Sequence, residues 1–213
     1  MRIHDKLDEV LNDIRTEVGE LITNRYIYIE IRNIFDKNSK LSRVNDELFW
    51  WIYRNHVYSA LMSIRRLYDD DPDCNSLLKF LNIILSNPTI LSRQRYVGIF
   101  QGDGEYEEAN SIFDKIVGKG KDHIDPKEVL KEIDILKDKK DKFEEFINKR
   151  VAHQDKRKVT KIPVTKDLED FIKYLKELTI KYSMLFDGLD HLDIKPSIQA
   201  NWTDIFKIPW IQS

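Results

Sequence analysis

Residues 125–156 read DPKEVLKEIDILKDKKDKFEEFINKRVAHQDK, and this stretch decides the fold. Asp125 can cap a helix, because a short acidic side chain accepts hydrogen bonds from the free backbone N–H groups of the first turn, and Pro126 suits the first helical position. Apolar residues then follow at helical spacing, at Val129, Ile133, Leu136, Phe143, Ile147 and Val151. The stretch therefore predicts a long amphipathic helix with one apolar face.

The rest of the chain shows the same period. Apolar residues recur at helical spacing over 3–35, 49–68, 77–85 and 168–186, and weaker helical pieces cover 90–100 and 105–117. Helix caps are expected at Asn45 or Asp46, at Asn75 or Ser76, and at Thr165. Residues 26–31 alternate like a strand, but no second segment offers them a partner, so they are read as helix. We expect an all-α fold, a bundle of about five to seven helices with helix 49–68 at its centre.

Composition excludes several classes of protein. The chain has 213 residues, a net charge of −2, 34% charged residues and only 7 glycines and 6 prolines, which is typical of long helices. No stretch approaches the roughly 18 apolar residues of a membrane-spanning helix, and the charged N-terminus lacks an apolar signal segment. The single cysteine, Cys74, forbids an internal disulfide. We therefore expect a cytoplasmic protein.

We expect one helical domain in three parts: an N-terminal helical region over 1–45, a bundle over 46–187 and an irregular tail over 188–213. In the tail, Trp202, Phe206 and Trp210 are expected to pack against the bundle rather than to bind a ligand.

Most motifs for cofactors are missing from the sequence. It contains no phosphate-binding loop, dinucleotide fingerprint, zinc-protease helix, hydrolase elbow or calcium loop. The run Asp69–Asp71 could clamp a divalent cation, but an acidic run just past a helix end is more often solvated. No cofactor and no metal are expected.

One segment combines a fixed positive charge with a titratable group. On an α-helix that advances about 100° per residue, with Phe143 at zero, Ile147 falls at about +40°, Arg150 at about −20° and His153 at about −80°. Arg150 would then lie within the buried stripe, where a cation needs an anion, a subunit boundary or a polar cleft. An arginine that holds a phosphate and a histidine that moves a proton are the minimal equipment for cleaving RNA at its 2′-hydroxyl without a metal.

Two blocks of sequence resemble the abortive-infection-U-like branch of the HEPN superfamily, over roughly residues 46–158. The first is the aromatic helix with Phe49-Trp50 that ends in RRLYD (65–69), followed by SLL (76–78); the second is NKRVAHQD (148–155). The resemblance implies a helical bundle in which an arginine and then a polar residue precede a histidine near the end of one helix. Two copies of this motif meet across a homodimer, and catalytic members form a metal-independent ribonuclease site. Members often act as toxins in phage defence or in toxin–antitoxin pairs.

The sequence departs from the family pattern at one position. With Asn148 as the polar residue and His153 as the histidine, Ile147 stands where the family has arginine. Arg150 could supply the missing charge from a neighbouring face. Arg65 or Arg66 is another candidate, although a salt bridge with Asp69 or Asp70 at helical spacing is the simpler reading of that pair.

Two hypotheses follow. In the first, the chain is a homodimeric RNA endonuclease: His153 is the general acid or base, Arg150 binds the scissile phosphate and Asn148 assists, while the substrate is also bound by Lys149, Arg66 and Lys156. From Lys149 to Lys161 there are six basic residues and one acidic residue. This surplus of positive charge would attract a polyanion, but it is equally typical of a solvated helix C-terminus, where cations are favourable. In the second, the chain has lost catalysis and is a helical dimer that binds RNA, a nucleotide or a partner protein such as an antitoxin.

Overall fold

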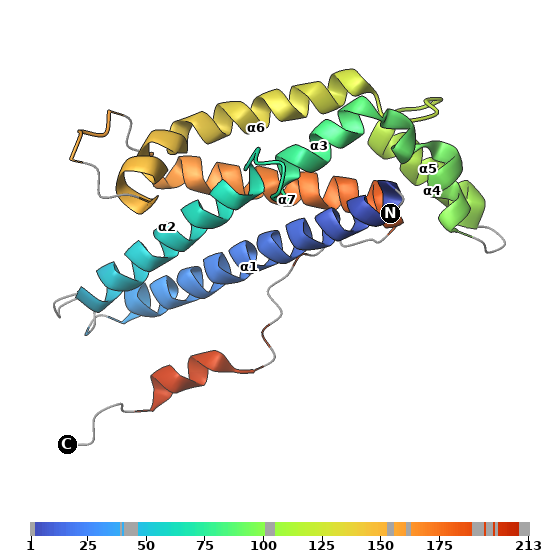
Figure 1. Cartoon of the computed structure of the whole chain (residues 1–213). Coiled ribbons are helices and arrows are strands. Elements are labelled where there is room, and N and C mark those ends of the chain that lie inside the picture. Colours follow the sequence, from blue (N-terminus) through green and yellow to red (C-terminus); the bar gives the residue numbers. More distant parts are fainter. Residues whose placement is uncertain are drawn as a thin grey trace.

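The structure is a computed structural model that describes residues 3–38, 40, 47–100, 105–152, 156–160, 163–188, 194, 198 and 200–208 (Figure 1). Its α-helices are α1 (Ile3–Lys37), α2 (Glu47–Leu67), α3 (Leu77–Ser86), α4 (Arg93–Ile99), α5 (Glu105–Val117), α6 (Pro126–Phe146) and α7 (Thr165–Asp187). Shorter segments are the 3-10 helices η2 (Pro88–Leu91) and η4 (Trp202–Lys207) and the π-helix η3 (Ile147–Ala152). The expected all-α fold is confirmed, and residues 26–31 belong to the continuous helix α1.

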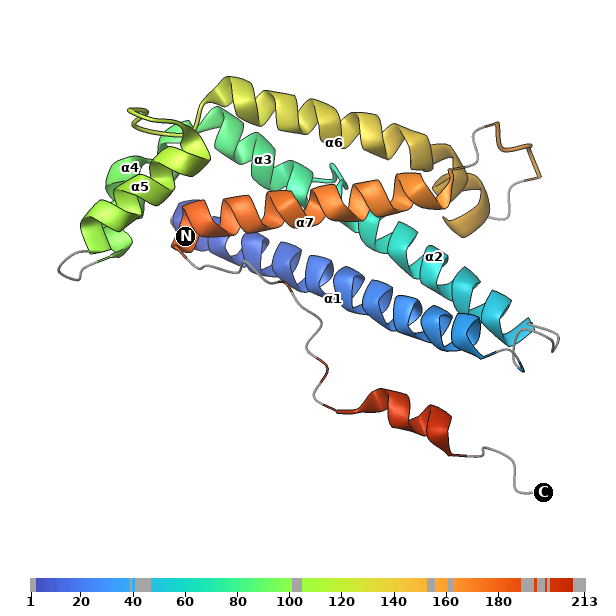
Figure 2. The ribbon, with the colours of Figure 1, turned by 180° about the vertical axis from the view of Figure 1, so that it is seen from behind.

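The long helices pack around one hydrophobic core. Helix α1 lies against α2 and α7, and α3 lies against α6 (Figures 1 and 2). The core takes buried residues from every helix from α1 to α7. Helices α4 and α5 form a pair at the end of the bundle where α6 begins, and the π-helix follows α6 at the opposite end, where α7 starts. These two ends are about 30 Å apart, the length of a 21-residue helix.

Local capping explains where α3, α6 and α7 begin. The Asp125 side chain accepts a hydrogen bond from the N–H of Lys127, with Pro126 as the first helical residue, as predicted. Ser76 caps α3 by accepting from the N–H of Lys79. The prediction of Thr165 as a cap is wrong: Thr165 is already helical, and the first turn of α7 is closed by Asp167, which accepts from the N–H of Val164. The predicted cap at Asn45 or Asp46 lies outside the described residues.

Helix α2 is less central than its composition predicts. Its buried residues all lie from His56 onward, whereas Trp50 and Trp51 in its first half are 52% and 61% exposed. The side of this half that carries Phe49 and Tyr53 packs against Tyr28 of α1, and the two tryptophans lie on other sides of the helix. The expectation of a central position is therefore wrong for the first half of α2.

Buried His56 makes the fold sensitive to acid. Its ring stacks on Tyr28 at a centroid distance of 4.4 Å, its Nδ1 has no hydrogen-bond partner among the described residues, and burial, with the charge of Arg25, lowers its pKa to about 4. The unfolded chain binds this proton near pH 6.5 and the folded chain only near pH 4, so the free energy of unfolding falls as the pH decreases through this window. We expect the protonation of His56 to lower the free energy of unfolding by about 3 kcal/mol between pH 6.5 and pH 4.

The variant His56→Phe tests this assignment, because it keeps the stacked ring and removes the titration. Urea unfolding at several pH values should give a shallower loss of stability in acid for the variant than for the wild type. Equal slopes for the two proteins would contradict a neutral buried His56.

The tail does not pack as expected. Helix η4 buries none of its residues, and Figure 1 shows it apart from the long helices. Trp202 instead contacts Phe206 within the same segment, with 6.1 Å between the ring centroids. The packing prediction is wrong for these two residues, and Trp210 lies outside the described part of the chain. Among the described helices, none combines the length and the apolar character needed to cross a lipid bilayer.

Candidate functional site

The segment that follows α6 is a π-helix, and this changes which side chains face the core. In a π-helix the hydrogen bonds join residues five apart, so each residue advances by less than on an α-helix. Ile147 remains fully buried and Val151, four residues on, packs against the core. Arg150 is exposed. The prediction that Arg150 lies in the buried stripe is therefore wrong, because it assumed an unbroken α-helix.

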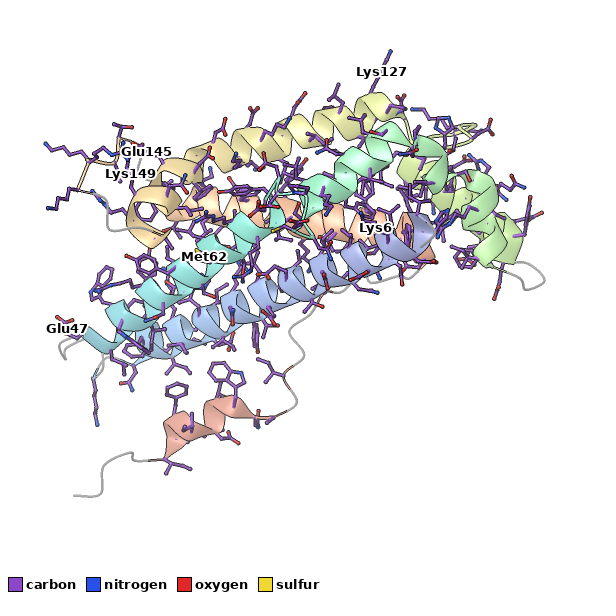
Figure 3. All side chains as sticks on the ribbon, in the orientation of Figure 1. Lys6, Glu47, Met62, Lys127, Glu145 and Lys149 are labelled. Carbon is purple, nitrogen blue, oxygen red and sulfur yellow. The ribbon has the colours of Figure 1, made fainter. Side chains whose placement is uncertain are left out.

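Glu145, in the last turn of α6, holds the chain where it returns after the π-helix. Its carboxylate accepts from Lys149 Nζ at 2.7 Å and from both the N–H and the hydroxyl of Thr160 at 3.0 and 2.7 Å. Lys149 also donates to the carbonyl of Lys158 at 3.0 Å. Figure 3 shows Glu145 and Lys149 beside each other at this end of the bundle. Lys149, a predicted substrate ligand, is thus half-buried and used to join two parts of the chain.

Arg150 makes a second link of this kind. Its Nη2 donates to the carbonyl of Arg157 at 3.1 Å. Asn148 and Lys156 are exposed on the same segment. Over residues 147–152 and 156–160 the sequence contains five cationic residues and no acid. We define these two stretches together as the basic segment; a concentration of positive charge of this kind attracts a polyanion.

The described histidines, His4, His56 and His123, do not belong to the basic segment, and His191 lies outside the described residues. His4 is in the first turn of α1. His153 lies outside the described residues. His56 is in α2, and its lowered pKa keeps it neutral near pH 7. His123 forms a β-bridge with Ser92 next to the start of α6, at the far end of the bundle. His153 therefore remains the only histidine that the sequence connects to the basic segment.

Among the described residues, no contact joins Arg66 to the basic segment. Its guanidinium forms two hydrogen bonds with Glu17 of α1, at 2.6 and 2.8 Å, and this contact raises the pKa of Arg66. The alternative prediction, a salt bridge from Arg66 to Asp69 or Asp70, is also wrong, because Glu17 is the partner of this guanidinium. A partner from another helix is invisible to a rule based on spacing within one helix.

The acidic run after α2 closes local turns. The carboxylate of Asp69 accepts from the N–H of Asp71 at 3.0 Å, and that of Asp71 accepts from the N–H of Asp73 at 2.9 Å. Within the described residues, no group of three or more potential ligands is arranged to hold a metal ion. The run therefore acts as a turn former after the helix.

A cavity of about 300 Å³ opens between α2, the end of α6 and the start of α7. Its walls include Trp50, Arg54, Phe146 and Val164. The sequence did not point to this cavity, because a helix at the centre of the bundle is expected to pack its aromatic residues against other helices. The signal was the adjacent pair Trp50 and Trp51, since neighbouring residues on a helix lie about 100° apart and seldom both face one core.

We expect Glu145→Ala to loosen the returning chain, because the substitution removes the acceptor for Lys149 and Thr160. Trypsin should then cut after Lys156, Arg157 or Lys158 several-fold faster than in the wild type, as measured by mass spectrometry of the first fragments. The matched control is Glu144→Ala, since Glu144 pairs with Lys140 on the same helix. Equal rates for the two variants would show that Glu145 does not order this stretch.

Comparison with known proteins gives the family. A HEPN family model, described as AbiU2, matches residues 4–200, which include the basic segment, all of the α-helices but the first residue of α1, and part of the tail. No curated protein and no solved structure matches the chain. The match covers far more than half of the 213 residues. This chain belongs to the AbiU2 family of HEPN proteins.

Proposed function

We propose that this chain is a metal-independent RNA endonuclease that acts as a homodimer in the cytoplasm, in phage defence or as the toxin of a toxin–antitoxin pair. Membership of a HEPN family makes a ribonuclease role in abortive infection the leading function. The observation that carries the proposal is the basic segment: Asn148 and Arg150 are exposed on a π-helix, among cationic residues. π-Helical turns occur often at functional sites.

The proposed chemistry uses the 2′-hydroxyl of the RNA itself. His153 takes the proton from this hydroxyl, or protonates the leaving 5′-oxygen, because the pKa of an imidazole lies near neutrality. The 2′-oxygen bonds to phosphorus as the bond to the 5′-oxygen breaks, which leaves a cyclic phosphate and a free 5′-hydroxyl. Arg150 stabilises the charge on the phosphate, and Asn148 donates a hydrogen bond to it. Lys156 adds positive charge along the backbone.

The proposed homodimer is supported by apolar side chains on the outer side of α2. Leu48 and Trp51, three residues apart and so on one face of the helix, are 51% and 61% exposed. A second copy would cover this surface and bring two motifs together. Light scattering at micromolar concentration should give the mass of a dimer, and a monomer would contradict this part of the proposal.

A second candidate function is favoured by Ile147. This position, where the family has arginine, is occupied by an apolar side chain that is fully buried. A chain that lost its catalytic arginine would remain a helical dimer that binds RNA, a nucleotide or a partner such as an antitoxin. The deciding experiment is the incubation of the purified chain with RNA in EDTA: cleavage supports the endonuclease, and binding without cleavage supports the second candidate.

A further inference from the structure

We propose that the cavity between α2, the end of α6 and the start of α7 binds an unpaired base of the RNA, which stacks on Trp50. This inference rests on the proposed function, because it assigns to the same protein a second contact with its RNA. It predicts that single-stranded RNA is preferred over a duplex, since only an unpaired base can leave the strand and enter an aromatic pocket.

The walls of the cavity are formed by packed residues. The rings of Trp50 and Tyr53 meet edge to face at 5.8 Å, and the Tyr53 hydroxyl lies 3.3 Å from that of Thr165 at the start of α7. Phe143 and Leu168 line the cavity and belong to the buried core. Trp50 is held on one side by these contacts and is still 52% exposed. An aromatic face that is both fixed and exposed can stack a base at low entropic cost.

The position of the cavity relative to the basic segment favours RNA over an apolar peptide. Phe146, which lines the cavity, directly precedes the π-helix, and Pro163, which also lines it, follows the returning chain. The basic segment therefore begins directly after one residue of the cavity wall and ends three residues before another. A strand whose phosphates lie along the basic segment would have a base within reach of the cavity.

Arg54 gives the cavity a positive charge. It lines the cavity one helical turn after Trp50, it is exposed, and among the described residues no ion pair involves it. A guanidinium stacks on bases and also attracts phosphate, so it complements a nucleotide better than an apolar side chain. The combination of aromatic rings with a cation is the one that single-stranded nucleic acids bind.

The binding of labelled RNA, measured by fluorescence anisotropy on ice, tests the inference. The probes are a short single-stranded RNA and a duplex of the same length, each checked on a denaturing gel after the measurement. We expect Trp50→Ala to weaken single-strand binding about tenfold, as for the loss of one stacked base, and to leave duplex binding within about twofold. Trp50→Phe should restore most of the affinity, because it keeps a ring in place. The control is Tyr106→Ala, which removes a 64% exposed ring from α5 at the opposite end of the bundle.

The outcomes separate this inference from the proposed function. If the wild type binds RNA and Trp50→Ala binds both probes as tightly, the base pocket is wrong and the proposed function stands. Equal losses for the single strand and the duplex would also overturn the pocket, because they indicate a general loss of binding. A change in the mass of the Trp50→Ala protein by light scattering would assign the cavity to an interface between copies. If the wild type binds neither probe, the proposed function fails and the pocket fails with it.

Discussion

His153→Ala is expected to lower the rate of RNA cleavage in EDTA at least about 100-fold, because proton transfer by a positioned histidine contributes a factor of this size or more. EDTA removes any contribution from adventitious divalent cations, so the remaining cleavage does not depend on a metal. The measurement is the rate of disappearance of a labelled RNA on a denaturing gel. The ends of the products give a second readout, since attack by the 2′-hydroxyl leaves a cyclic phosphate.

The matched control is His123→Ala. His123 lies next to the start of α6, about 30 Å from the π-helix along a 21-residue helix. We expect this variant to cleave RNA at the wild-type rate. Both variants should also keep the wild-type melting temperature within a few degrees, which separates a chemical role from unfolding. Wild-type cleavage that survives His153→Ala would contradict the proposed site and indicate either a different site or a contaminating nuclease.

Ile147→Arg is expected to lower the free energy of unfolding by about 4 kcal/mol. Ile147 is fully buried at the first position of the π-helix, which contacts α2. The substitution removes an apolar side chain from the core and places a guanidinium there, and a buried charge without a partner costs several kcal/mol. For a chain of this length the melting temperature should fall by about 8–16 °C. Urea unfolding followed by circular dichroism measures the change.

Two control variants separate the loss of the apolar side chain from the introduction of the charge. Ile147→Val removes one methyl group and should cost only about 1 kcal/mol. Asn148→Arg introduces the same cation one residue later at an exposed position, and should change stability by less than about 0.5 kcal/mol. A loss below about 1 kcal/mol for Ile147→Arg would show that the arginine reaches solvent by extending along the protein surface.

The burial of Ile147 changes how the departure from the family pattern is tested. From the sequence, restoring the arginine is the obvious way to create cleavage in a decayed enzyme. In this fold the same substitution perturbs the core, so the absence of cleavage by Ile147→Arg would carry no information about catalysis. Arg150 is the better residue to test, because it is exposed on the same π-helix. Its replacement should act on the RNA rather than on the core.

Local interactions made much of the fold predictable. The cap at Asp125 and the proline after it depend on hydrogen bonds and dihedral angles within one turn, so the sequence predicts the start of α6 correctly. The apolar period predicts a helix over 168–186, which lies within α7, because a helix that buries one face repeats every three to four residues. Residues 26–31 alternate like a strand, and the lack of a partner segment was the reason to assign them to helix, which α1 confirms. The same local reasoning identified the motif segment and its charge.

The tertiary structure decided the properties that depend on residues far apart in the chain. The partner of Arg66 is Glu17, which lies on another helix, and the exposure of Trp50 depends on which sides of α2 are covered by other helices. After the change from α-helix to π-helix that follows Phe146, Arg150 lies in solvent, while Ile147 stays in the core as its spacing predicts. Spacing along the sequence defines an angle around a helix only while the hydrogen-bonding pattern is unchanged. The residues of the basic segment were therefore readable from the sequence, whereas the side on which each of them lies required the packed bundle.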